Sequence, residues 1–198
     1  MKLPTTIAAM ALACASQQGI ATPFSDCPSE AFLVQSTVAQ LFGVQLATGH
    51  YQLLSDSMGT SGKLNAIAFN FHDNYLYAYS NEFSTLVKID NAYQVSPLSV
   101  SGLPSTSFYV GDIALDENVY YSYRPGSDYG LYRVSLDSSD PDYLAMSKIV
   151  DGNTLNLKIY DMAFHPFDGF AYTVDNRGIL HRIDVDGGTS SSLGDVGQ

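Results

Sequence analysis

Four side chains that could bind a metal ion recur at matching places in the sequence. Asp112 and Asp161 each directly precede a short apolar segment with alanine at its centre, and Asp116 and His165 follow the same two segments. Carboxylate oxygens are preferred ligands of Ca²⁺, and a set of carboxylates with histidine can hold a catalytic divalent metal. If the two segments line a common axis, these side chains predict an acidic metal site of the kind that a lyase or hydrolase uses. The alternative is structural, because Asp at a strand end also bonds the backbone of the adjoining turn.

No other pattern in the sequence predicts a reaction. The four histidines show no i,i+2 or i,i+4 spacing, and the acidic loops at 137–142 and 184–186 lack the ligand order of an EF-hand. Nucleophile-elbow, P-loop and dinucleotide-binding glycine patterns are also absent. Tyrosine, at 14 positions, could form a sugar- or peptide-binding surface because it joins a flat face to a polar tip, although in strands it is also ordinary filler.

The candidate residues belong to a repeat of about 45 residues. Its clearest part is a segment of the form Leu-x-Lys/Arg-Ile/Val that starts at Leu86, Leu131 and Leu180, with a degenerate copy at Leu41. The four starts are separated by 45, 45 and 49 residues. Internal periods of this size indicate stacked supersecondary units rather than one globular core.

Each full repeat contains four short segments rich in Tyr, Ile, Val and Phe, separated by Asp, Asn, Gly and Pro. This pattern is typical of strands and turns, and four strands at this period predict a blade of a β-propeller. Residues 27–54 supply only three such strands. We therefore expect an all-β fold: a partial β-propeller with one incomplete N-terminal blade and three four-stranded antiparallel blades over residues 27–198. Apolar residues do not recur at helical spacing after residue 30, so hardly any helix is expected.

The repeated strand should present its two faces to different neighbours. Successive side chains of a strand point to opposite faces, so Leu86 and Lys88 share one face and Val87 and Ile89 share the other. An incomplete propeller leaves two blade faces open, and about six stranded apolar side chains would forgo about 9–18 kcal/mol of burial. We therefore expect the chain to be marginally stable or to self-associate through its open blade faces.

Composition excludes two classes of partner. The formal net charge is -11, so the phosphate backbone of a nucleic acid and an anionic membrane surface are both repelled. No stretch of about twenty apolar residues is present, so no membrane-spanning helix is expected.

The N-terminus has the features of an export signal. Residues 1–21 have a lysine at position 2, continue with an apolar stretch and offer cleavage after Ala15 or after Ala21. A lipoprotein anchored at Cys14 is the alternative. Either cleavage leaves Cys27 without a partner in the chain, which indicates a free thiol or a partner in sequence beyond this chain. The expected location is extracellular or at the cell surface, with the periplasm as a further possibility.

The sequence resembles a family of secreted bacterial β-propellers whose domain has no assigned function. The likeness rests on the segments Asn65–Phe69 and Asp73–Tyr77, on the Leu-x-Lys/Arg-Ile-Asp strands, and on the Val110-Gly111-Asp112 entry to the next repeat. It covers roughly residues 27–198. The resemblance implies the N-terminal part of a longer surface or extracellular protein, and it carries over no catalytic residue.

Two functions follow as hypotheses. The first is an extracellular binding module that presents its loops to an unknown protein or glycan ligand, because repeat architectures build such surfaces and no catalytic signature is present. The alternative is a propeller enzyme, a metal-assisted lyase or hydrolase, whose axial site is formed by Asp112, Asp116, Asp161 and His165. A third possibility is a fragment with no independent function.

Overall fold

The computed structural model describes residues 21–25 and 29–197. Most of the expected export signal, and Cys27, lie outside these residues. Over the described part the chain forms fifteen strands and one four-residue helix, in agreement with the expected scarcity of helix. None of the helices in this part is long and apolar enough to cross a membrane.

Four antiparallel sheets follow one another along the chain, each built from consecutive strands. Blade 1 contains β1 (Ala31–Gln35), β2 (Gln40–Val44) and β3 (Tyr51–Ser55). Blade 2 contains β4 (Leu64–Asn70), β5 (Tyr75–Ser80), β6 (Thr85–Ile89) and β7 (Val95–Pro97). Blade 3 contains β8 (Val110–Ile113), β9 (Val119–Tyr123), β10 (Gly130–Ser135) and β11 (Met146–Asp151). The helix α1 (Gly152–Leu155) leads into blade 4, which contains β12 (Ala163–Phe164), β13 (Ala171–Val174), β14 (Ile179–Asp184) and β15 (Thr189–Asp195).

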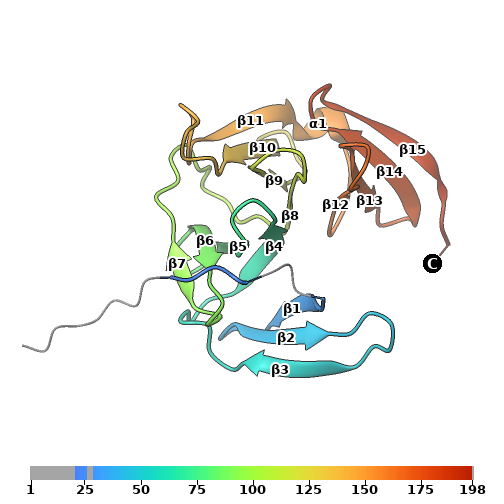
Figure 1. Ribbon diagram of the computed structural model, residues 1–198. Helices are drawn as coiled ribbons and strands as arrows, with labels where there is room; N and C mark the ends of the chain where they lie inside the picture. Colours follow the sequence, from blue (N-terminus) through green and yellow to red (C-terminus); the bar gives the residue numbers. More distant parts are fainter. Residues whose placement is uncertain (1–20, 26–28, 198) are drawn as a thin grey trace, which may run out of the picture.

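The four sheets are arranged as blades around a common centre (Figure 1). The strands nearest the centre contact one another in sequence, β1 with β4, β4 with β8 and β8 with β12. Blades 1 and 4 stand at the two ends of this series. The predicted fold, a partial propeller with one three-stranded blade and three four-stranded blades, is confirmed.

A separate apolar core fills the space between each pair of successive blades. The repeated strand supplies both sides of these cores, because alternate residues point to opposite faces of the sheet. Leu86 lies in the core between blades 2 and 3, whereas Val87 and Ile89 lie in the core between blades 1 and 2. The predicted division of the repeated strand between two neighbours is therefore confirmed.

A group of acid, tyrosine and base, in which the tyrosine is hydrogen-bonded to the acid, accompanies the cores and repeats in three blades. In blade 2 the hydroxyl of Tyr77 donates to Asp73 over 2.6 Å, and the ammonium group of Lys88, opposite Tyr77 across the strands, lies 3.1 Å from the same carboxylate. The ammonium group also lies 3.6 Å from the centre of the Tyr75 ring. A tyrosine bonded to a carboxylate four residues earlier and facing an arginine across the strands recurs in blades 3 and 4: Glu117, Tyr121 and Arg133; Asp168, Tyr172 and Arg182. In blade 2 the basic residue of the repeat thus contacts the turn that joins the first two strands, and in blades 3 and 4 the arginine lies across the strands from the tyrosine that is bonded to this turn.

Candidate functional site

The four predicted metal-binding side chains lie in two different places. Asp112 is on β8, close to the centre of the propeller, and Asp161 directly precedes the β12 region of the next blade. Asp116 and His165 lie beyond the other ends of these segments, in the turns that lead to β9 and β13. Within residues 21–25 and 29–197, no group of three or more His, Cys, Asp or Glu side chains is placed to hold a metal ion.

Asp112 lines a central cavity of about 250 Å³ that is open on one side and whose walls come from blades 1, 2 and 3. Apart from Glu30 and Asp112 its lining is apolar: Ala31, Phe32, Ile67, Ala68, Phe69 and Leu76. Burial raises the pKa of Asp112 to about 6; hydrogen bonds from backbone N–H groups oppose the rise and the nearby charge of Asp161 adds to it. One Asp112 oxygen accepts a hydrogen bond from the backbone N–H of Phe164 over 2.8 Å, so the side chain also ties blade 3 to blade 4.

Asp161 has a more local environment. Burial raises the pKa of its carboxyl group, and a 2.9 Å hydrogen bond from the backbone N–H of Met162 opposes that rise. Asp112 and Asp161 therefore interact electrostatically, and both act on the backbone next to β12. Perturbed carboxyl groups are candidates for function as well as structural caps.

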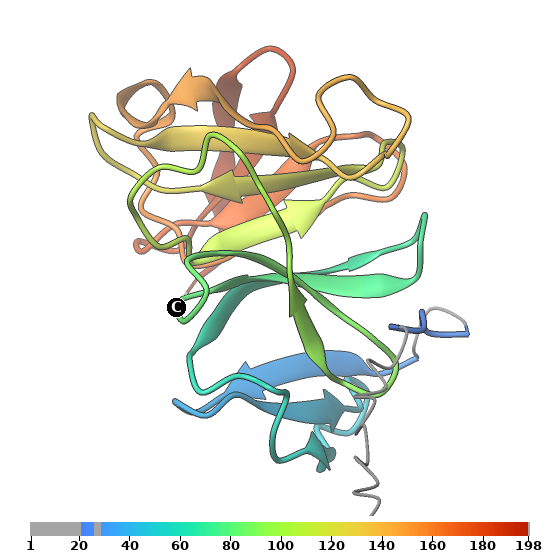
Figure 2. The same ribbon diagram turned by 90° about the vertical axis from the view of Figure 1, so that its left-hand side faces the viewer.

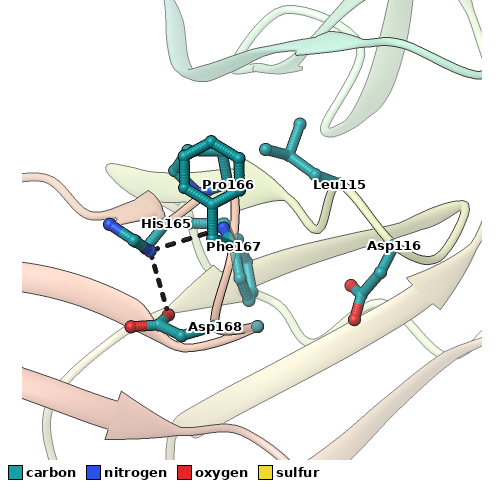
Figure 3. Close-up of a pocket in the computed structure, with 8 residues that line it drawn as sticks. Leu115, Asp116, His165, Pro166, Phe167 and Asp168 are labelled. Carbon is teal, nitrogen blue, oxygen red and sulfur yellow. Dashed lines mark hydrogen bonds and ion pairs between the residues drawn. The ribbon is translucent and has the colours of Figure 1, made fainter.

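Asp116 and His165 line a second pocket, of about 400 Å³, on the turn between β12 and β13 (Figure 3). The pocket extends from the end of blade 3 to this turn of blade 4. Its lining residues are Leu115, Asp116, Phe164, His165, Pro166, Phe167, Asp168 and Gly169. We call it the turn pocket.

The turn of blade 4 is closed by its own backbone. The N–H of His165 donates to the carbonyl of Phe170 over 2.9 Å, and the N–H of Phe170 donates to the Asp168 carboxylate over 3.1 Å. Gly169 has φ +72°, a left-handed conformation that glycine adopts without steric cost. The pair Asp168-Gly169 is a turn signal that can be read from the sequence alone.

Asp168 joins the imidazole to the acid, tyrosine and base group of blade 4. Its carboxylate lies 3.4 Å from Nδ1 of His165 (Figure 3). The same carboxylate accepts a 2.7 Å hydrogen bond from the hydroxyl of Tyr172. Burial opposes ionisation of Asp168, but the hydrogen bonds from Tyr172 and Phe170 and the charges of His165 and Arg182 lower its pKa below the ordinary value. The turn pocket therefore holds an ionised carboxylate beside an imidazole at neutral pH.

Corresponding turns of successive blades approach each other. Asn70, in blade 2, donates from its side-chain amide to Asn118 of blade 3 over 2.7 Å. Asp116 of blade 3 comes within 3.5 Å of the place where a side chain at Gly169 would begin. His165 holds the matching position in blade 4 and is exposed. The residue at this position contacts the next blade in blade 2, whereas in blade 4 it is His165, whose imidazole faces solvent.

Sequence reasoning missed the most exposed aromatic side chain of the pocket. Phe167 is 91% exposed, and its ring centroid lies 5.9 Å from that of His165. Asp168 was missed as well, although the same acid and tyrosine spacing occurs in blades 2 and 3. The sequence signal for Phe167 was an aromatic residue inside a polar turn between two strands, because a side chain in such a turn does not contribute to the apolar core.

Comparisons with known proteins describe the fold. A family model described as a repeat of unknown function (DUF6923) matches residues 32–198. A structural genomics protein of unknown function from Bacteroides thetaiotaomicron VPI-5482 superimposes with a TM-score of 0.55 at 17% identity, over 85% of this chain and 46% of the other. A chain of the nidogen/laminin complex superimposes with a TM-score of 0.55 at 15% identity, over 83% of this chain and 61% of the other.

The chain thus spans less than two thirds of either structure. At these identities the two likenesses show a shared fold. A search of curated proteins found no significant match.

Proposed function

The chain belongs to the family of the repeat of unknown function DUF6923, and we propose that its propeller is an extracellular binding module for a protein or glycan ligand. The turn pocket is the proposed contact surface. The proposal depends on one observation: Phe167, a large apolar side chain, is 91% exposed at the edge of a pocket with two carboxylates and an imidazole.

The chemistry of the turn pocket suits either ligand class. An aromatic ring provides a flat apolar face for a sugar ring or an apolar side chain, and the carboxylates of Asp116 and Asp168 accept hydrogen bonds from hydroxyl or amide groups. Aromatic side chains also supply much of the binding energy in protein interfaces. The similar fold in a nidogen/laminin complex supports a role in protein binding, since that structure contains a protein assembly.

Binding measurements on two kinds of probe test the proposal. The probes are an array of neutral and acidic oligosaccharides and a sensor coated with laminin. We expect at least one probe to bind, and we expect Phe167→Ala and Asp116→Asn to weaken that binding at least tenfold. Leu46→Ala is the control, because Leu46 is 81% exposed in the turn between β2 and β3, away from the turn pocket. Absence of binding to both probes, or equal affinity in all variants, contradicts the proposal.

A propeller enzyme is the second candidate, and the raised pKa of Asp112 in the central cavity favours it. A carboxyl group with a pKa near neutrality can act as a general acid or base. In this proposal a divalent ion such as Ca²⁺ is held near Asp112 and Asp161. Elemental analysis of the purified protein tests it: metal that is present in the parent protein should be lost in Asp112→Ala and Asp161→Ala. Metal content that is unchanged in both variants, or no metal in the parent, counts against this enzyme.

A further inference from the structure

We number the residues of the repeated strand from its leucine, so that Leu86 holds the first place and Ile89 the fourth. Residues at the same place are buried in some blades and exposed in others. The second and fourth places point toward the preceding blade, and they are buried in blades 2, 3 and 4: Val87, Ile89, Tyr132, Val134, His181 and Ile183. The first place points toward the following blade, and it is completely buried in blades 1, 2 and 3: Leu41, Leu86 and Leu131. A face of the repeated strand is therefore buried wherever a neighbouring blade lies against it.

Within residues 21–25 and 29–197, no blade lies on the face of blade 1 that holds its second and fourth places. Phe42 and Val44, which occupy these places, lie in cross-strand register with Leu53 and Tyr51 respectively, and Leu33 faces Phe42 from β1. Leu33, Leu53 and Tyr51 are 41%, 51% and 66% exposed. We call this apolar surface, which spans all three strands of the blade, the leading face of blade 1.

In blade 4 the opposite face is not covered by any residue that the structure describes. Its first place is Leu180, which is only half-buried and lies opposite Val174, a residue that is 42% exposed. The corresponding pairs in blades 2 and 3 are buried: Leu86 with Tyr79, and Leu131 with Tyr123. We call the surface around Leu180 and Val174 the trailing face of blade 4.

The charge on the trailing face does not prevent apolar packing. Arg182 stacks on the ring of Phe170 at 4.4 Å, just as Lys88 lies 3.6 Å from the ring of Tyr75 in blade 2. The face of blade 2 that contains Lys88 is packed against blade 3. A basic side chain at this place is therefore compatible with a covered face, because its charge rests on an aromatic ring and its stem remains apolar.

We propose that these two faces bind each other between two copies of this chain. The trailing face of blade 4 in one copy covers the leading face of blade 1 in another, and the contact repeats the packing already present between successive blades. The observations point to a second copy because the part of the chain that the structure describes offers one uncovered face of each kind. Figures 1 and 2 both show blade 1 and blade 4 apart, at the two ends of the series, so the faces do not cover each other within one copy.

The proposed contact joins two different surfaces, so it is a head-to-tail interface. The resulting dimer still carries one open face of each kind, and association continues until the series of blades closes on itself. Sedimentation velocity of the 198-residue chain over a range of concentrations should therefore show growth beyond the monomer. A single monomeric species up to the highest soluble concentration overturns the proposal.

Paired variants test which faces meet. Leu53→Lys places a charge on the leading face, and Val174→Lys places one on the trailing face. Each variant alone should weaken self-association at least tenfold, whereas Leu46→Lys, at a residue 81% exposed in the β2–β3 turn, should leave it unchanged. Circular dichroism and thermal unfolding establish that each variant keeps the fold of the parent.

Mixing the two variants separates a head-to-tail contact from a symmetric one. A Leu53→Lys copy keeps its trailing face and a Val174→Lys copy keeps its leading face, so an equimolar mixture should form one-to-one dimers that grow no further. A Val174→Lys protein that still dimerises alone would show that leading faces bind each other and would overturn the proposal. A mixture that stays monomeric would also overturn it.

Discussion

Replacement of Asp112 by asparagine should stabilise the protein at neutral pH. The carboxyl group has a pKa of about 6 in the folded chain, against an ordinary value of 3.8. Because the folded state holds this proton more tightly, the resulting stabilisation is complete below about pH 3.8 and is lost as the pH rises through about 6. Above that pH the folded chain bears the cost of a charge on a half-buried carboxylate.

The size of this effect follows from the two pKa values. A difference of about two pKa units corresponds to about 3 kcal/mol. Asparagine has nearly the same shape, carries no charge, and keeps an oxygen that can accept the 2.8 Å hydrogen bond from the Phe164 N–H. We therefore expect Asp112→Asn to raise the free energy of unfolding by about 2–3 kcal/mol at pH 7.5 and by less than about 1 kcal/mol at pH 4.

Urea unfolding at pH 4, 5, 6 and 7.5 measures the difference at each pH. A gain of this size corresponds to a rise of roughly 4–12 °C in the melting temperature of a protein of this length. Asp116→Asn is the control, because Asp116 is exposed and a surface substitution should change stability by no more than about 0.5 kcal/mol. A difference that is the same at every pH, or an Asp112→Asn protein that is less stable at pH 7.5, would refute the assignment of a half-buried, charged carboxylate at this position.

Three further predictions concern the repeat, the turn and the leader. Tyr77→Phe removes the 2.6 Å hydrogen bond to the turn carboxylate four residues earlier and should cost about 1–2 kcal/mol in urea unfolding, whereas Tyr51→Phe, at an exposed ring, should cost nothing measurable. Gly169→Ala should lower the free energy of unfolding by about 1–2 kcal/mol because φ is +72°. Gly49→Ala, at φ +71° with no atom near the added carbon, should cost the same. A much larger loss for Gly169→Ala would mean that Asp116, its neighbour across the pocket, cannot move aside. Expression in a secreting host should yield a protein that lacks residues 1–15 or 1–21 by mass spectrometry, and an intact N-terminus would contradict the export signal.

The repeat predicted the fold because it is a local signal. Strand positions, turn positions and the alternation of faces depend on residues within a few positions of one another, and all of these were readable from the four copies that start at Leu41, Leu86, Leu131 and Leu180. Each copy lies on a strand of a separate blade. The inference of stacked blades followed because none of these units can bury its apolar faces alone.

The candidate site was harder to predict because it depends on distances between segments. Asp112 and Asp116 bracket one short extended segment, as Asp161 and His165 bracket another, and four residues of extended chain span roughly 13 Å. The tertiary structure therefore divides them between the central cavity and the turn pocket. The reach of the chain argues against one shared site, but only the positions of the blades show which neighbours each side chain meets.

What the amino-acid sequence determined by itself is the unit: a four-stranded blade whose strands have two apolar faces. What only the tertiary structure decided is which of those faces meets another blade. Leu86 and Leu180 hold the same place in the repeat, yet one is completely buried and the other is partly exposed. The reason is that a side chain is buried only where a neighbouring blade packs against it, and that blade comes from a part of the chain about 45 residues away.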